Sequence, residues 1–267
     1  SATLRENVVS LARNIGYVPR SRSAAKANIS FSLNTTSTSP TATLSAGLVC
    51  VGTVENSNYV FSIPNDIVTT IVGGVATFEN IDIFQGTFLR KQFVVDGSLD
   101  QRFLLDNSFI DSSTIVVKVR GLSDTGTLGR EYSLATNILN IDSTSEIYLL
   151  QEVKDERYEL LFGDGYFGKK LENGAVISAT YIITDGKQGN GPTNFSYSGR
   201  IVDDLGNPIV PSSNITINTN SAASNGGDIE SVDSIKYFAP RIYASQYRAV
   251  TARDYEAIIQ SIYPNTE

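Results

Sequence analysis

The feature that most constrains the fold of this chain is an alternation of apolar and polar residues through its middle. Ile115, Val117 and Val119 alternate with Thr114, Val116, Lys118 and Arg120, and the same period of two recurs in three further segments. These segments are 157–162, 176–183 and 214–218. Successive side chains of a strand point to opposite faces of its sheet, so this period predicts β-strands with one face buried.

Short turn signals, most of them with glycine, separate these strands. They are Gly73-Gly74, Asp96-Gly97, Gly121, Asp164-Gly165, Asp185-Gly186 and Gly206-Asn-Pro208. Strands that are separated by turns, without helical segments between them, are typical of antiparallel sandwich or barrel folds. The middle of the chain is therefore predicted to be antiparallel β structure.

Helical periodicity is found at the two ends of the chain. Residues 3–15 have apolar side chains at helical spacing, and Thr3 with Glu6 matches a capping box, in which each side chain satisfies a free backbone donor. The helix is expected to end before Pro19, and residues 19–27 are expected to form an extended arm.

Near the other end, residues 228–238 are predicted to form a helix that Ala239-Pro240 terminates, because proline lacks the N–H that continues a helix. A second helix is expected after Thr251, with an apolar stripe along one face. The chain contains no methionine, and helices stand close to both of its ends, so we expect it to be a piece of a longer protein.

Together these patterns predict a mainly β fold with some α (α+β). We expect an elongated molecule with two small antiparallel β domains, sandwich-like or barrel-like, flanked by an N-terminal helix and by C-terminal helices. The predicted division is a helix and arm over 1–30, a first β domain over 31–130, a second β domain with glycine-bearing hairpins over 131–220, and a helical segment over 221–267.

Composition removes several classes of function. The chain has no histidine, which excludes imidazole acid–base catalysis, Ser/His/Asp and Cys/His nucleophiles, and nearly all zinc and copper sites. Cys50 is the only cysteine and stands in an apolar run, so it is expected to be a small buried side chain. We expect no cofactor, no metal ion and no small-molecule substrate.

The formal net charge of −7 argues against two kinds of partner. A nucleic acid would require clustered lysine and arginine to displace counterions, and an anionic membrane surface would attract a basic protein. No apolar run is close to the roughly 20 residues that span a bilayer. We therefore expect neither nucleic acid nor membrane as a partner.

Residues 163–168 match the GxGxxG spacing of dinucleotide-binding loops. That function requires a strand before the motif and a helix after it, so that the helix N-terminus meets the pyrophosphate. The residues after Gly168 favour a turn and another strand. We therefore interpret the motif as a β-turn with glycines at positive φ.

Arginine and tyrosine gather between positions 241 and 255, and these residue types are the most enriched in protein interfaces. The candidate interface residues are Arg241, Tyr243, Tyr247, Arg248, Arg253 and Tyr255. An equally weighted alternative is an intramolecular role, in which the arginines bind Asp254 or backbone carbonyls.

The same segment resembles the signature of the baseplate J-like family of contractile phage tails. The matching residues are Tyr237-Phe-Ala-Pro-Arg241, Arg248-Ala-Val-Thr251 and Asp254-Tyr255, in that order. The glycine-bearing region around 162–191 resembles the hairpins of that family. The opening, from Leu4 to Ser21, resembles the wedge proteins of T-even-type myophages within it.

The resemblance implies a virion protein of the tail baseplate with no catalytic site. Proteins of this kind surround the tail hub and join neighbouring wedges into a ring that changes diameter when the sheath contracts. The implied partners are a second copy, as a dimer within the ring, and other wedge proteins. A ring that opens needs hinges between rigid units, and the polar stretches 34–43 and 218–227 are the hinge candidates.

Two other functions remain open from the residues. The first is a β-rich receptor-binding or carbohydrate-binding tail module, which would also be rich in tyrosine and asparagine. The absence of tryptophan, a favoured platform for stacking on ligands, weighs against it. The second is a glycosidase that uses two carboxylates and needs no histidine.

Overall fold

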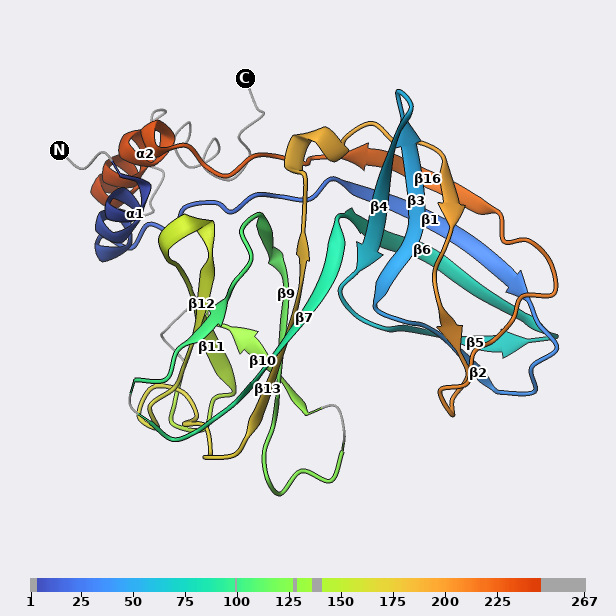
Figure 1. Ribbon diagram of the computed structural model, residues 1–267, viewed down its shortest axis with the longest axis horizontal. Helices are drawn as coiled ribbons and strands as arrows, with labels where there is room; N and C mark the ends of the chain where they lie inside the picture. The colour runs from blue at the N-terminus through green and yellow to red at the C-terminus, as the bar shows by residue number, and fades with distance from the viewer. Residues whose placement is uncertain (1–3, 99, 127–128, 136–140, 246–267) are drawn as a thin grey trace.

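The computed structural model of the 267-residue chain describes residues 4–98, 100–126, 129–135 and 141–245. Within these ranges the protein is mainly β, with two sheets side by side and a helix near each end (Figure 1). The predicted mainly β class with a flanking helix at each end is confirmed. The second C-terminal helix, expected after Thr251, lies outside the described residues.

The first sheet has nine strands in the described part of the chain, and all of its pairings are antiparallel. They are β1 (Lys26–Asn34), β2 (Thr41–Leu44), β3 (Gly47–Val54), β4 (Ser57–Ile63), β5 (Ile67–Val72), β6 (Val75–Gln85), β14 (Phe195–Tyr197), β15 (Ile201–Val202) and β16 (Ile217–Ser224). The order is β14-β3-β4-β6-β5-β2-β15, and β1 pairs with both β6 and β16. Its core contains stacked rings of Phe31 and Phe78, whose centroids lie 5.0 Å apart.

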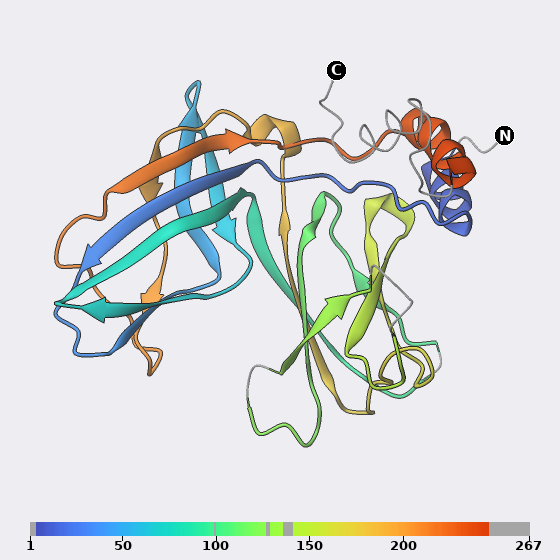
Figure 2. The ribbon, with the colours of Figure 1, turned by 180° about the vertical axis from the view of Figure 1, so that it is seen from behind.

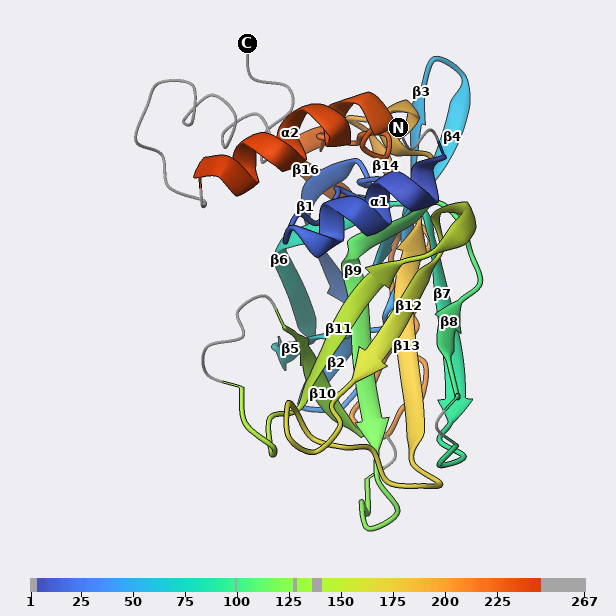
Figure 3. The same ribbon diagram turned by 90° about the vertical axis from the view of Figure 1, so that its left-hand side faces the viewer.

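The second sheet has seven strands among the described residues, in the order β7-β13-β9-β10-β11-β12-β8. They are β7 (Thr87–Val94), β8 (Phe103–Leu105), β9 (Ile110–Arg120), β10 (Arg130–Leu134), β11 (Ile147–Glu152), β12 (Tyr158–Phe162) and β13 (Val176–Ile183). The two end strands come close to each other, because Phe93 contacts Phe103 and Lys91 forms an ion pair with Asp106. The sheet therefore nearly closes into a barrel (Figure 3).

The predicted alternation explains which side of the second sheet is buried. Val117 and Val119 of β9 and Ile177 and Ala179 of β13 point into the apolar core, while residues between them point outward. Each strand buries one face because the sheet curls around a single core. The short pairing of β10 with β11 is parallel, unlike its neighbours.

The two sheets do not follow the chain in consecutive blocks. Strands β7 to β9, within the expected first domain of 31–130, lie in the second sheet, and β14 to β16 return to the first sheet. The chain crosses between the sheets at Gly86 and again after Ile183 (Figure 1). Whether either sheet is an independent domain stays a prediction.

Neither hinge candidate lies between the two sheets, and the expected loop is found only in the first candidate, over 35–40. Residues 217–224 form β16, which pairs with β1 along most of its length, so 218–227 is largely a strand of the first sheet. Residues 35–40 connect β1 to β2, two strands of that same sheet. For 218–227 the polar composition suggested a loop, but backbone pairing decides where a strand forms, and polar side chains on an exposed face do not prevent it.

The N-terminal helix α1 spans Arg5–Asn14 and confirms the predicted helix. Its N-cap residue is Leu4, whose side chain makes no capping hydrogen bond, and Thr3 of the expected capping box lies outside the described residues. Two short 3-10 helices also occur, η1 (Lys154–Glu156) and η2 (Gly186–Gly189).

The C-terminal helix α2 spans Val232–Ser245, so the expected stop at Pro240 is wrong. An internal proline costs about 3 kcal/mol because it removes one backbone hydrogen bond. Ala239 and Ile242 on either side of it are buried against α1, and this packing continues the helix past the proline. No described helix is long and apolar enough to span a membrane.

Two smaller predictions agree with the structure. Cys50 is fully buried in the first core, and burial raises the pKa of its thiol to about 12. In the GxGxxG segment, Gly165 and Gly168 have positive φ, and the residues between Gly168 and β13 are not helical. A Cβ on Gly163 would lie 2.2 Å from the backbone of Gly168, so the motif is a tight turn.

We expect Gly86→Ala to destabilise the protein by about 2–4 kcal/mol, because two penalties act together at this crossing. The residue has a φ of +140°, and an added Cβ would lie 2.2 Å from the Ile183 carbonyl oxygen. Urea unfolding measures the change. Gly206→Ala is the matched control, since Gly206 has a φ of +84° and open space around it. Equal losses in both variants would contradict the steric argument.

Candidate interaction site

The two helices pack against each other at one end of the molecule, away from most of the first sheet (Figures 1 and 3). Buried apolar residues of both helices form the contact: Val8, Val9 and Ala12 from α1, and Ile235, Ala239 and Ile242 from α2. We call α1 and α2 together the helix pair. Burial of one apolar stripe on each helix explains why these short segments are helical here.

The helix pair leaves large apolar and aromatic side chains exposed. Leu4 and Leu11 of the N-terminal segment are 60% and 58% exposed, and Tyr237 and Tyr243 of α2 are 51% and 60% exposed. Isolated exposed apolar residues are common on protein surfaces. Four on two short adjoining helices are more typical of a surface that another protein covers.

Of the candidate interface residues, Arg241 and Tyr243 lie on α2, and both are exposed. The guanidinium of Arg241 stacks on the ring of Tyr237 at 3.6 Å from its centroid and donates a hydrogen bond to the Tyr237 carbonyl oxygen. This contact matches the intramolecular role considered for the arginines. The other four candidates, Tyr247, Arg248, Arg253 and Tyr255, lie outside the described residues.

A buried carboxylate anchors the helix pair. Glu230, just before α2, accepts hydrogen bonds from the Tyr17 hydroxyl at 2.7 Å, the Arg20 backbone N–H at 3.0 Å and the Ser234 hydroxyl at 2.8 Å. Its own backbone N–H donates to the Arg20 carbonyl oxygen. The carboxylate therefore joins the start of α2 to the segment that follows α1.

Arg5 of α1 ties the helix pair to the second sheet. Its guanidinium forms a bidentate ion pair with Glu152 at the end of β11, with distances of 2.7 and 3.1 Å, and it also donates to the Glu230 carbonyl oxygen. Both side chains are largely buried, and bidentate pairs of this type are strong and geometrically specific.

The segment after α1 is held against the second sheet by a buried acid. Asp111 of β9 accepts hydrogen bonds from the Ala24 backbone N–H and from the backbone N–H and hydroxyl of Ser113. Burial raises the pKa of this carboxyl, and those three bonds act in the opposite direction. Its position explains why the arm stays attached to β9 despite its polar composition.

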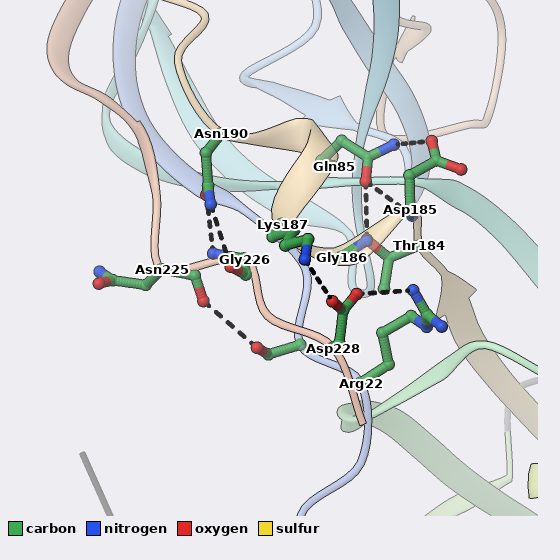
Figure 4. Close-up of polar contacts among 11 residues, drawn as sticks. Arg22, Gln85, Thr184, Asp185, Gly186, Lys187, Asn190, Asn225, Gly226 and Asp228 are labelled. Carbon is green, nitrogen blue, oxygen red and sulfur yellow. Dashed lines mark hydrogen bonds and ion pairs between the residues drawn. The ribbon is translucent and has the colours of Figure 1, made fainter. Parts of the chain in front are cut away.

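Two antiparallel segments connect the helix pair to the sheets. Ser23 and Gly227 exchange a pair of backbone hydrogen bonds of 3.0 Å each, and the two segments run side by side in both ribbon views (Figures 1 and 2). Asp228 accepts from Arg22 at 3.2 Å and from Lys187 at 3.1 Å, which links these segments to η2 (Figure 4).

The same close-up shows where the chain crosses between the sheets (Figure 4). The buried Gln85 side chain accepts from the Thr184 hydroxyl at 2.7 Å and the Asp185 backbone N–H at 3.0 Å, and it donates to the Asp185 carboxylate at 2.8 Å. Asn190 exchanges two hydrogen bonds with the Gly226 backbone. We call this network, with Arg22, Lys187 and Asp228, the junction.

Sequence patterns did not indicate these anchoring residues. Glu230, Asp111 and Gln85 are single polar residues in unremarkable local sequence, and only the tertiary contacts bury them. Within the described residues, no group of three or more acidic or cysteine side chains is placed to hold a metal ion. Glu230 and Asp111 accept hydrogen bonds from neighbouring segments.

We expect Glu230→Gln to lower the free energy of local unfolding of the helix pair by about 1–3 kcal/mol. The glutamine amide would place an N–H donor where three hydrogen-bond donors now meet a carboxylate. Hydrogen exchange should become faster in α1 and α2 and stay unchanged in the sheet cores. Glu79→Gln, at an exposed position of β6, makes the same charge change and should alter neither. Unchanged exchange in α1 and α2 of the Glu230 variant would show that this carboxylate does not anchor them.

No protein-family model matches the chain. The baseplate wedge protein gp6 of Enterobacteria phage T4 is 26% identical over an alignment 282 residues long, which covers 97% of this chain and 41% of that relative. The chain thus spans less than half the length of gp6. It is a distant homologue of this phage baseplate wedge protein over nearly all of its own length.

Proposed function

We propose that this chain is a structural component of a contractile phage tail baseplate wedge, found in the virion and without catalytic activity. The observation that carries the proposal is the similarity to a baseplate wedge protein over 97% of the chain. The framework is consistent with a structural part, since its buried acids are hydrogen-bond acceptors for neighbouring segments.

Within a wedge, we propose that the helix pair joins neighbouring subunits into a ring around the tail hub. Its exposed Leu11 and Tyr243 offer apolar area for burial, and Arg241 is already held in place on Tyr237. The helix pair lies at one end of the molecule, where hydrogen bonds to Glu230 and the ion pair of Arg5 with Glu152 hold it in place. An anchored surface loses little conformational freedom on binding, which favours affinity.

When the sheath contracts, we propose that this chain moves largely as one body and that the rearrangement occurs at contacts between subunits. The hydrogen bonds of Gln85, Asn190 and Asp228 cross-link every segment that passes between the sheets. A hinge usually consists of a few weakly bonded residues that can change φ and ψ. The junction residues are instead held by several hydrogen bonds and ion pairs, which oppose a change of φ and ψ.

Sedimentation over a wide concentration range tests the interface. We expect the chain to associate reversibly. Leu11→Gln combined with Tyr243→Gln should weaken this association by about 10-fold or more, because the substitutions remove exposed apolar area and glutamine has a good helix propensity. Val68→Thr combined with Val72→Thr is the matched control. It replaces two exposed apolar side chains of β5, far from the helices, and should leave association unchanged.

Two outcomes would contradict the interface proposal. A chain that stays monomeric throughout would show that the helix pair is not sufficient for self-association. Association that the β5 control weakens as much as the helix variant would place the contact elsewhere. In either case the baseplate role would be examined by co-assembly with other wedge proteins, the second class of partner.

A further inference from the structure

A groove of about 170 Å³ lies between the two sheets. One wall is the outer face of β7, β13 and β9 in the second sheet, and the other is formed by Ala46 and the turn at 64–66 of the first sheet. The groove is distant in sequence from the helices, and its lining comes from both sheets. It takes no part in the interface proposed above.

Three cations line this groove: Arg90 of β7, and Lys118 and Arg120 of β9. Most described arginines and lysines near carboxylates form ion pairs, as Arg5, Arg102 and Lys169 do. The three groove cations have no ion-pair partner and no side-chain hydrogen bond within the described ranges. In a chain with a net charge of −7, a local gathering of unpaired positive charge is a specific feature.

The strand register sets the spacing of these charges. Ser178 of β13 lies opposite Lys118, and Thr180 lies opposite both Arg90 and Val116. Lys118 and Arg120 are two residues apart on one strand, so they share a face at about 7 Å. Hydroxyl groups therefore lie beside a row of cations, and both can donate hydrogen bonds to an anionic group.

Two acids near the groove form no ion pair with these cations in the described parts of the chain. Asp66 lines the groove, but one of its carboxylate oxygens accepts a hydrogen bond from the Ala46 backbone N–H at 2.7 Å. Glu131 of β10 is the register partner of Lys118, yet the two form no ion pair. The lining therefore carries three cations and one carboxylate, and the excess positive charge can attract an acidic partner.

We propose that this groove binds an extended acidic segment of a partner protein, with carboxylates at every second residue. An extended peptide repeats its side chains on one face at about 7 Å, which equals the spacing of Lys118 and Arg120. Arg90, two strands away at about 10 Å, holds a third carboxylate or the flank of the peptide. Complementary charge sets both the choice of partner and the rate of association.

The chemistry favours a protein partner over a nucleic acid. Nucleic acids bind through many phosphate contacts, and the net charge of −7 would repel a long polyanion beyond the groove. The three groove cations, which have Asp66 and Glu131 nearby, can bind a short acidic stretch of a partner whose remaining sequence carries little charge. The inference stands apart from the proposed baseplate function, since it requires only a partner with such a segment.

Fluorescence anisotropy with a labelled peptide of alternating glutamate and serine tests the proposal on the whole chain. We expect this peptide to bind with a strong salt dependence and the glutamine–serine peptide not to bind. Lys118→Glu combined with Arg120→Glu should weaken binding by at least about 10-fold. Arg90→Gln, a milder change at an exposed position, should weaken it by about 3-fold and keeps the test valid if the double variant fails to fold.

Arg200→Glu is the matched control, because Arg200 is an exposed, unpaired cation beside β15 in the first sheet. It should leave peptide binding within about 2-fold of the original. Absence of peptide binding would overturn the proposal, and so would an equal loss in the control. A single-stranded oligonucleotide that binds more tightly than the peptide, or inorganic phosphate that displaces the peptide, would show a phosphate site instead and would also overturn it.

Discussion

The buried amide of Gln85 is the interaction on which the relation between the two sheets depends. It stands at the end of β6, where the chain first leaves the first sheet, and it binds Thr184 and Asp185, where the chain returns from the second. A buried amide whose partners were removed would cost about 1–3 kcal/mol, so the network holds both crossings together. The close contact of Gly86 with Ile183 adds a steric constraint at the same place.

Both surfaces proposed for binding follow from this constraint. The cationic groove exists only because the turn at 64–66 is held over the outer face of β9 and β13. The helix pair is placed by two segments that pass through the junction and are then fixed by Glu230 and by Arg5 with Glu152. The structural role proposed above would use such stiffness, because it keeps the two contact surfaces at a constant separation.

The candidate site was partly visible in the sequence. The Arg- and Tyr-rich segment begins within α2, and Arg241 and Tyr243 are exposed there. The pairing of α1 with α2 could not be inferred, since it joins segments more than 200 residues apart through an apolar stripe that any partner could cover. The groove cations were equally hidden, because Lys118 and Arg120 looked like the solvated side of an ordinary strand.

Local sequence patterns are sufficient to predict the mainly β class, the strands around 115–119, 158–162 and 176–183, and the helix near each end. These follow from local periodicity, which needs no knowledge of distant partners. The tertiary structure alone decided that β7 to β9 leave the first sheet, that β16 forms where a loop was expected, and that α2 continues past Pro240. In each case pairing or packing with remote segments outweighed a local preference of a few kcal/mol.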